Sequence, residues 1–227
     1  MAKVAVLDRE MFGHQTAARL LRVHPSTLWW WLEGGARRGK VYRPVIRPEP
    51  TGSKSVTWGE FVEAGLLRQY RREHDVKLSE VRGFIDAARQ QLGVAYPLAH
   101  HRPFVGPGRL LMLELQDELG LSPDLCLVAV ASGQLVLTGP AQEFLARVEW
   151  DEDVPEAWRP HDDELSPVRM RPSQRFGLPS IGGVRTEVLW EQVEAGADVD
   201  EVAEDFSVSP ADVRWALSYE NSARAAA

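Results

Sequence analysis

Hydrophobic and polar positions near the start of the chain follow the 3.6-residue period of an α-helix, and they do so twice. Residues 13–35 therefore predict two short helices around a tight turn. Four apolar residues share one face of the first helix: Ala17, Ala18, Leu20 and Leu21. Pro25 suits the first position of the second helix, where its missing N–H costs nothing. Gly34 and Gly35 are expected to end that helix, because glycine tolerates positive φ.

Three consecutive tryptophans lie in the second of these helices. Successive residues of a helix are turned by about 100°, so the three rings cannot share one face. The helical wheel places Trp31 beside Leu28 and Leu32 on the apolar side, and Trp30 on the opposite side. We expect Trp31 to pack in the core and Trp30 to point outward, with Trp29 between them.

The next segment interleaves cations with β-favouring residues, which predicts a two-stranded basic wing. Its cations are Arg37, Arg38, Lys40, Arg43 and Arg47, and its β-favouring residues are Val41, Tyr42, Val45 and Ile46. A loop rich in proline and glycine follows over 48–55. Thr57 and Glu60 have the spacing of a capping box, which predicts a helix over 58–74. Apolar residues at helical spacing predict another helix from about Ser79 to Leu92.

The remainder of the chain changes from strand-like to helical patterns. Residues 124–139 contain two β-rich runs joined at Ser132 and Gly133, which predicts a hairpin, and 140–150 predict a short helix returning to a strand. Three helices are predicted near the C-terminus, with Thr186, Asp198 and Ser209 at their starts. The expected fold is α+β, mainly helical, with an N-terminal winged helix-turn-helix, a hairpin-containing middle and a three-helix C-terminal domain. The expected parts are 1–95, 96–150, an acidic proline-rich linker or arm over 151–172, and 173–227.

The two halves of the 227-residue chain differ in charge, and the net charge of −7 conceals this difference. Residues 1–95 hold 16 Lys and Arg against 10 Asp and Glu, whereas residues 96–227 hold 10 against 23. Hydrophobic residues make up 44% of the chain and charged residues 26%, as in ordinary globular proteins. A basic front half and an acidic back half suggest two partners, one of them an anion such as nucleic acid.

Several function classes are not favoured by the sequence. No apolar run is long enough to span a bilayer and the N-terminus lacks a signal-peptide core, so we expect a cytoplasmic protein without membrane contact. Cys126 is the one cysteine, which excludes an intramolecular disulfide and a thiolate-rich zinc site. His100, His101 and residues 161–164 lack the helical spacing of zinc ligands. With no phosphate-binding loop or nucleophile elbow either, we expect no metal, no cofactor and no enzymatic activity.

A helix-turn-helix followed by a basic wing is typical of DNA-binding proteins. The second helix resembles that of the MerR-like winged helix, which commonly runs Thr-Leu-Arg-Tyr-Tyr. Thr27 and Leu28 match that pattern, Trp30 and Trp31 take the aromatic places, and Trp29 stands where an arginine is usual. The expected DNA-binding residues are Ser26, Thr27, Trp29 and Trp30 near base edges or sugars, and Arg37, Arg38, Lys40 and Arg43 at phosphates.

The C-terminal segment resembles a small antitoxin domain, whose pattern runs Gly-x-Arg-Thr, a helix, Ala-Gly, an acidic helix and a helix ending near Ala-Leu-x-Tyr. The matching positions are Gly183, Arg185, Thr186, Ala195, Gly196, 201–206, Ala216, Leu217 and Tyr219. With its N-terminal half, the chain resembles a VapB-type antitoxin of a type II toxin–antitoxin pair. The resemblance implies a homodimeric autorepressor that binds operator DNA and neutralises a PIN-domain, VapC-type ribonuclease toxin.

Four arginines in or beside the arm are the expected toxin contacts: Arg169, Arg171, Arg175 and Arg185. The resemblance implies that they pair with metal-binding carboxylates of the toxin, although they could equally pair with acidic residues of this chain. Residues 186–221 carry ten acidic side chains and one basic, so they suit a basic protein surface better than DNA. Two alternatives remain: a MerR-like regulator whose middle region binds a small-molecule effector, and an interaction adaptor with a degenerate DNA-binding fold.

Overall fold

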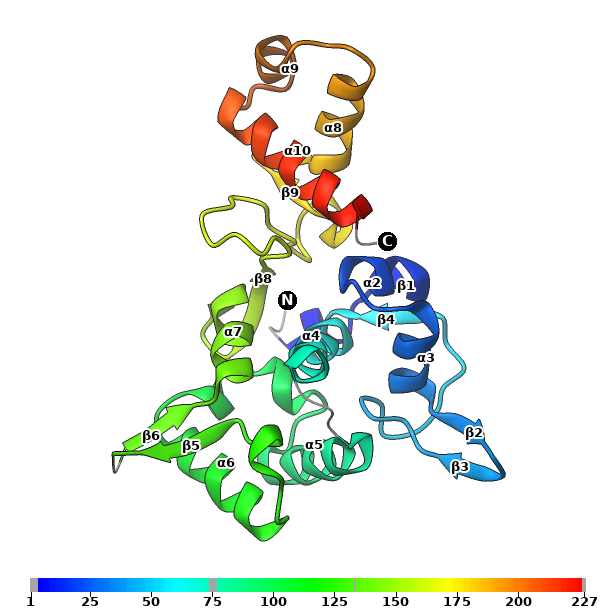
Figure 1. The fold of residues 1–227 in the computed structure, drawn as a ribbon, viewed down its shortest axis with the longest axis vertical. Helices are drawn as coiled ribbons and strands as arrows, with labels where there is room; N and C mark the ends of the chain where they lie inside the picture. The colour runs from blue at the N-terminus through cyan, green and yellow to red at the C-terminus, as the bar shows by residue number, and fades with distance from the viewer. Residues whose placement is uncertain (1–3, 74–76, 133, 226–227) are drawn as a thin grey trace. The chain divides into compact units, whose positions relative to one another are not determined.

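The computed structural model describes residues 4–73, 77–132 and 134–225, which form two compact units (Figure 1). The N-terminal unit consists of Met1–Ala146 and Trp150–Pro155, and the C-terminal unit consists of Arg147–Glu149 and Glu156–Ala227. Helices dominate both units and the strands pair two by two, so the fold is α+β, as the sequence predicts. The four-part division of the sequence is finer than these two units.

The N-terminal unit is built from helices with three small antiparallel sheets among its described residues. The helices are α1 (Val4–Leu7), α2 (His14–Leu20), α3 (Pro25–Glu33), α4 (Trp58–Glu73), α5 (Leu78–Leu92), α6 (Pro107–Glu118) and α7 (Gly139–Arg147). The sheets pair β1 (Glu10–Gly13) with β4 (Ser55–Thr57), β2 (Gly35–Arg37) with β3 (Lys40–Tyr42), and β5 (Val128–Ala131) with β6 (Gln134–Leu137). Short 3-10 turns η1 (Pro97–Ala99), η2 (Arg102–Phe104) and η3 (Pro123–Leu125) connect them.

Most helices predicted in this half of the chain form close to the expected residues. Thr57 and Glu60 make the reciprocal capping box that begins α4, with Thr57 N to Glu60 Oε2 at 2.9 Å and Glu60 N to Thr57 Oγ1 at 3.2 Å. The predicted end of that helix at 74 and the turn residue 133 of the β5–β6 hairpin lie outside the described residues. Strands β1 and β4 were not predicted, because runs of four and three residues carry no readable alternation.

Two of the expected wing residues are not in a strand. Val45 and Ile46 are each 1% exposed, and their N–H groups both donate to the carbonyl of Trp31, at 2.8 and 3.0 Å. Trp31 itself is 1% exposed, so its predicted place in the core is confirmed. The chain after β3 therefore runs under the end of α3 and caps it, because a helix end offers carbonyls without intrahelical partners.

Arg47 is also part of this core and not of a basic surface, which corrects the expectation from the sequence. Its side chain is about 5% exposed and lies between the carboxylates of Glu33, the last residue of α3, and Glu60 in the first turn of α4. Arg47 Nε donates to Glu60 Oε1 at 2.7 Å, and Nη1 donates to Glu33. The guanidinium also donates to Thr51 Oγ1 at 2.7 Å and to the Ser55 carbonyl at 2.7 Å.

Opposite charges and hydrogen bonds outweigh burial in this cluster. Burial disfavours both charged forms, yet the pKa of Glu33 is lowered because Gly52 N–H, Thr51 and Arg47 all stabilise its carboxylate. The pKa of Arg47 is raised, since its pairs with Glu60 and Glu33 exceed the effect of burial. The end of α3, the loop after the hairpin and the start of α4 are thus joined through one cation.

Glu63, one turn further along α4, is buried, and none of the ion pairs among the described residues involves it. The N–H of Leu98 donates to its Oε1 at 3.0 Å, and Oε2 has no hydrogen-bond partner among the described residues. Burial raises the pKa of Glu63 to about 8, although the Leu98 N–H and the charge of Arg89 act in the opposite direction. The carboxyl is therefore largely protonated at neutral pH.

The C-terminal unit contains the β9–β10 hairpin and three helices. Strands β7 (Val148–Asp151) and β8 (Val154–Trp158) pair with each other, and each has residues in both units. The other elements of the C-terminal unit are η4 (Arg175–Gly177), β9 (Ser180–Ile181), β10 (Val184–Arg185), α8 (Thr186–Glu194), α9 (Val199–Phe206) and α10 (Pro210–Ala225). Its core cluster is Val168, Ile181, Leu189, Val202, Ala203, Val213, Ala216 and Tyr219. Val168 and Met170, both 0% exposed, belong to the stretch expected to be a linker or arm, so that stretch also builds the core.

Two of the three capping residues predicted for the helices of this unit are confirmed. Asp198 caps α9 by accepting from Asp200 N at 2.8 Å, and Ser209 and Asp212 form a reciprocal pair at the start of α10. Thr186 is not a cap. It is buried, and its hydroxyl donates to Glu220 Oε1 at 2.6 Å, which ties the start of α8 to α10.

Replacing Arg47 by methionine should destabilise the protein by about 3–5 kcal/mol, because two carboxylates would be left buried without their cation. Arg43→Met is the control, since Arg43 forms an exposed pair with Glu49 that should contribute about 0–1 kcal/mol. Urea denaturation of both variants measures the difference. Equal losses in the two variants would contradict the role given to Arg47.

Glu63 should make stability fall with rising pH. Its pKa is raised on folding from an ordinary 4.5 to about 8, so the folded state holds a proton that the unfolded state releases. The stabilisation is complete below about pH 4.5 and is lost as the pH rises toward 8. The unfolding free energy of Glu63→Gln, minus that of the wild type, should grow by a few kcal/mol over this window, at about 1.4 kcal/mol per pKa unit. A difference that stays constant with pH would exclude this titration.

Candidate functional site

The β2–β3 hairpin follows directly on the end of α3 (Figure 1), and the cations in it are exposed. Arg38 and Gly39 form its two-residue turn with φ of 51° and 76°, and Arg37 pairs with Lys40 across it. Positive φ at both turn positions matches the right-handed twist of the strands. Arg37, Arg38 and Lys40 are exposed and make no ion pair with the described part of the chain.

The base of this hairpin is held by close contacts. A side chain on Gly34 (φ 64°) would place its Cβ 2.2 Å from the carbonyl oxygen of Tyr42, so only glycine fits there. From α5, Arg82 donates to the Pro44 carbonyl at 2.5 Å, and Arg89 donates to the Ile46 carbonyl at 2.7 Å. Sequence reasoning missed these two supports, because arginines on the polar face of a helix usually indicate a solvated surface.

Trp29 and Trp30 are both half-buried. The ring of Trp30 lies 5.7 Å from that of Tyr42 and in contact with Gly35, so it packs against the hairpin. Trp30 was expected to point outward, and it does so only in part, because the hairpin packs against one side of its ring. Trp29 contacts the ring of His14 edge-on at 5.4 Å. Both indoles still expose part of their surface, and that of Trp30 lies against the hairpin.

The remaining expected DNA contacts lie at the two ends of this segment. Ser26 is exposed at the start of α3, where its hydroxyl is 2.7 Å from His24 Nδ1, and Thr27 is half-buried. Arg43 lies beyond the hairpin and pairs with Glu49 at 3.0 Å, with both side chains largely exposed. Among the expected residues, the structure thus brings the hairpin cations and the exposed side of α3 together, and Arg43 is partly neutralised.

In the C-terminal unit, extended segments place arginines on one face and core residues on the other. Ser180 is paired in antiparallel β-fashion with Arg169 of one neighbouring segment and with Arg185 of the other. Residues paired directly across strands point to the same side, so these three side chains share a face. Val168 and Ile181 point to the opposite face, where they join the core of the unit. The alternation of strand residues therefore directs Arg169 and Arg185 away from this core, with Ser180 buried between them and Arg185 exposed.

The four expected toxin-binding arginines differ in how far they are engaged. Arg169 and Arg171 both pair with Glu149, the latter with Nη2 to Oε2 at 2.6 Å. This is the alternative pairing within the chain that the sequence left open. Arg175 is exposed and donates through Nε to the Gly183 carbonyl, which leaves its charge without an acidic partner among the described residues. Arg185 is exposed and makes no ion pair within the described ranges.

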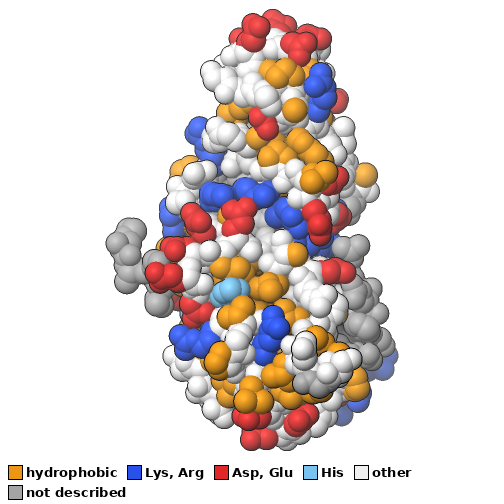
Figure 2. All heavy atoms as spheres, turned by 90° about the vertical axis from the view of Figure 1, so that its left-hand side faces the viewer, with side chains coloured by type: hydrophobic (Ala, Val, Ile, Leu, Met, Phe, Trp, Pro, Cys, Tyr) orange, Lys and Arg blue, Asp and Glu red, His pale blue; other side chains and the backbone are white. Residues whose placement is uncertain are grey.

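The helices of this unit present the opposite charge. Their exposed acidic residues are Glu191, Glu194, Asp198, Asp200, Glu201, Glu204 and Asp205. Figure 2 shows acidic side chains gathered at the end of the unit where α9 lies. This surface would repel phosphates, so it suits a protein surface that carries positive charge.

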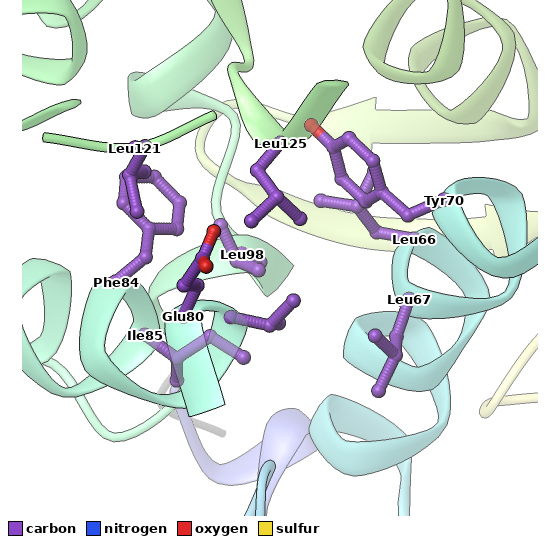
Figure 3. Close-up of a pocket in the computed structure, with 10 residues that line it drawn as sticks. Leu66, Leu67, Tyr70, Glu80, Phe84, Ile85, Leu98, Leu121 and Leu125 are labelled. Atoms are coloured by element: carbon purple, nitrogen blue, oxygen red, sulfur yellow. The ribbon is translucent and has the colours of Figure 1, made fainter. Parts of the chain in front are cut away.

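An apolar pocket lies within the N-terminal unit between α4 and α5 (Figure 3). Phe84 and Leu121 lie on one side of it, and Leu66, Leu67 and Tyr70 on the other. Its enclosed space is only about 10 Å³, roughly room for one water molecule. No sequence pattern marked it, because its lining comes from ordinary core positions of separate elements.

Neither a metal cluster nor a membrane span is found in the part of the chain that the structure describes. No three histidine, cysteine or acidic side chains are grouped there so that they could hold a metal ion. His100, one of the candidate ligand types, has its Nδ1 3.2 Å from Asp153 Oδ2. No described helix is both long and apolar enough to cross a bilayer.

Comparisons with known proteins extend over nearly the whole chain. It is 26% identical over 224 residues to a protein of Mycobacterium tuberculosis named "Putative antitoxin VapB45", which covers 92% of this chain and 93% of that protein. The crystal structure of Rv2018 from Mycobacterium tuberculosis matches with a TM-score of 0.74 at 26% identity, covering 93% of this chain and 99% of that one. Residues 168–219 match a family model described as "Protein of unknown function (DUF433)".

The highest identity among these relatives is to an uncharacterized protein. The chain is 30% identical over 226 residues to Rv2308 of Mycobacterium tuberculosis, which covers 96% of this chain and 93% of that protein. Because this identity extends from one end of both proteins almost to the other, the chain belongs to the same family as Rv2308.

Proposed function

We propose that this chain is a DNA-binding antitoxin without catalytic activity of its own. It represses its own operon by binding operator DNA, and it neutralises a PIN-domain, VapC-type ribonuclease by direct contact. The observation that carries the proposal is the exposed hairpin next to α3, whose cations Arg37, Arg38 and Lys40 have no ion pair among the described residues. The relative named as an antitoxin, similar over most of its length, supports the toxin-binding part.

On DNA, α2, α3 and the hairpin act as a MerR-like winged helix. Ser26 and Thr27 lie at the start of α3, which enters the major groove, while the hairpin cations neutralise phosphates. The half-buried rings of Trp29 and Trp30 offer apolar contact to sugars or thymine methyl groups in place of a guanidinium. A homodimer places two such modules on paired half-sites.

Toxin binding belongs to the C-terminal unit, where both signs of charge are exposed. Arg175 and Arg185 pair with carboxylates of the toxin, because their charges are not neutralised within the described residues. Arg169 and Arg171 are held by Glu149 and help to set the basic face. The acidic helices bind a basic rim of the toxin.

A second candidate function is transcriptional regulation by a small apolar effector, and the pocket between α4 and α5 favours it. The pocket is lined mainly by leucine and aromatic side chains, as ligand sites are, but its enclosed space of about 10 Å³ would have to widen before it could hold an effector. Glu80 adds one carboxylate to the lining. An effector bound there would lie between α4 and α5. Helix α4 begins with the capping box of Thr57 and Glu60, and α5 carries the arginines that hold the base of the hairpin.

Neutralising the hairpin should weaken DNA binding through charge alone. In the Arg37→Gln, Arg38→Gln, Lys40→Gln variant, affinity should fall for every DNA sequence, and the slope of log affinity against log salt should become shallower by roughly 0.9 per lost phosphate contact. Arg175→Gln with Arg185→Gln is the control and should leave the slope unchanged. Fluorescence anisotropy with operator DNA at several salt concentrations measures both. An unchanged slope in the hairpin variant would move the DNA contact elsewhere.

The antitoxin role is tested by co-expressing the full chain with the product of the reading frame next to its gene. The two proteins should co-purify, and the chain should restore growth that the neighbouring product arrests. The hairpin variant should still protect the cells, because its substitutions lie in the other unit. Failure of the wild-type chain to bind or protect contradicts the proposal.

The effector function is tested by adding indole as an apolar probe. If indole raises the melting temperature of the chain and changes its operator affinity, the effector function is favoured.

A further inference from the structure

The turn before β9 holds an aromatic side chain in an unusual backbone conformation. Arg175, Phe176 and Gly177 have φ of 47°, 55° and 73°, so three consecutive residues lie in the left-handed region. Gly177 N donates to the Gln174 carbonyl at 2.9 Å, and Leu178 N donates to the Arg175 carbonyl at 3.1 Å. Residues 174–178, which we name the Phe176 loop, therefore form a hydrogen-bonded left-handed turn.

This conformation costs free energy at both non-glycine positions, because the Cβ atom crowds the following carbonyl. A buried aromatic ring could offset that cost through packing. Phe176 is 77% exposed, so its ring gains little from the fold of this chain. A bulky residue kept at positive φ without a packing reason is a sign of function.

The loop is fixed to the rest of the unit at both ends. Arg175 Nε donates to the carbonyl of Gly183 in the β9–β10 turn. After Leu178 comes buried Pro179, whose carbonyl accepts from Thr186 N at 3.0 Å at the start of α8. The ring is thus displayed on a rigid frame, which lowers the entropy lost when a partner binds it.

The charges beside the ring indicate what kind of partner fits. Arg175 is adjacent in sequence, and Arg185 lies two residues beyond Gly183, to which Arg175 is bound. Both guanidinium groups are exposed and without an acidic partner in the described ranges. Aromatic and arginine side chains are the residue types that dominate binding energy at protein interfaces. A complementary surface has an apolar pocket with carboxylates at its edge.

We propose that Phe176 is the anchor by which this chain docks onto its toxin, a protein with an apolar pocket flanked by carboxylates. This inference rests on the proposed function and adds to it the side chain that fills the pocket. Arg175 and Arg185 then orient the docked ring by pairing with the carboxylates around it. The hydrogen bonds of the turn and of Arg175 with Gly183 keep the ring in its binding position before the partner arrives, in spite of the strain.

Leu165 provides a matched control in the same unit. It is 83% exposed, slightly more than Phe176, and its φ is not positive. Its N–H donates to Asp163 Oδ1 at 2.8 Å in a separate loop. It therefore tests whether any exposed apolar side chain of this unit would serve equally well.

The experiment measures the affinity of the full chain for the purified product of the neighbouring reading frame. Phe176→Ala should weaken it by roughly tenfold or more, as expected for a hot-spot residue, and Leu165→Ala should leave it unchanged. Phe176→Gly should weaken binding similarly and also raise the melting temperature of the free chain, because glycine tolerates the left-handed turn. A merely structural aromatic ring would give the opposite shift in melting temperature.

Each other outcome overturns the inference in a distinguishable way. Wild-type affinity in Phe176→Ala would remove the anchor while leaving the proposed function in place. A lower melting temperature of Phe176→Gly would show that the ring packs within the chain. A change from dimer to monomer in Phe176→Ala, with toxin affinity intact, would assign the ring to a second copy. No binding by the wild-type chain would overturn the proposed function, and this inference with it.

Discussion

A single buried cation organises the N-terminal unit. Arg47 is enclosed between Glu33 and Glu60 and also donates to the segment over 51–55, so the end of α3, a proline-rich loop and the start of α4 meet at its guanidinium. Five N–H donors in a planar fork can satisfy several acceptors at once, which an ammonium group cannot do in the same geometry. Because an unpaired buried charge is costly, no member of the cluster can leave without loss to the others.

This constraint explains how the hairpin comes to be exposed. Arg47 holds Glu33 and so fixes the position of the last turn of α3. Gly34, with its positive φ, then turns the chain directly into β2. Val45 and Ile46 return under Trp31, and arginines of α5 bind the carbonyls on either side. The base is thus fully hydrogen-bonded while the tip with its cations has no partner within the described residues.

The C-terminal unit separates its charges by simple geometry. Side chains of its extended segments alternate, so Val168 and Ile181 enter the core while Arg169 and Arg185 lie on the other face. The acidic residues occupy the outer surface of α8 and α9, whose apolar residues pack against the same core. One unit can therefore present a basic face and an acidic face to a single partner.

The amino-acid sequence by itself determined the local elements. Helical spacing, the capping pairs at Thr57 and Ser209, and glycine after α3 predicted most helices and both longer hairpins, because these signals act between residues close in the chain. Only the tertiary structure decided which charged residues remain available. Arg47 and Arg43 belong to one basic run, yet the first is buried between carboxylates and the second is exposed beside Glu49. Likewise, Trp30 is half-buried against a hairpin, whereas Phe176 is 77% exposed. Burial and ion pairing depend on residues distant in sequence, and no local pattern records which of them will meet.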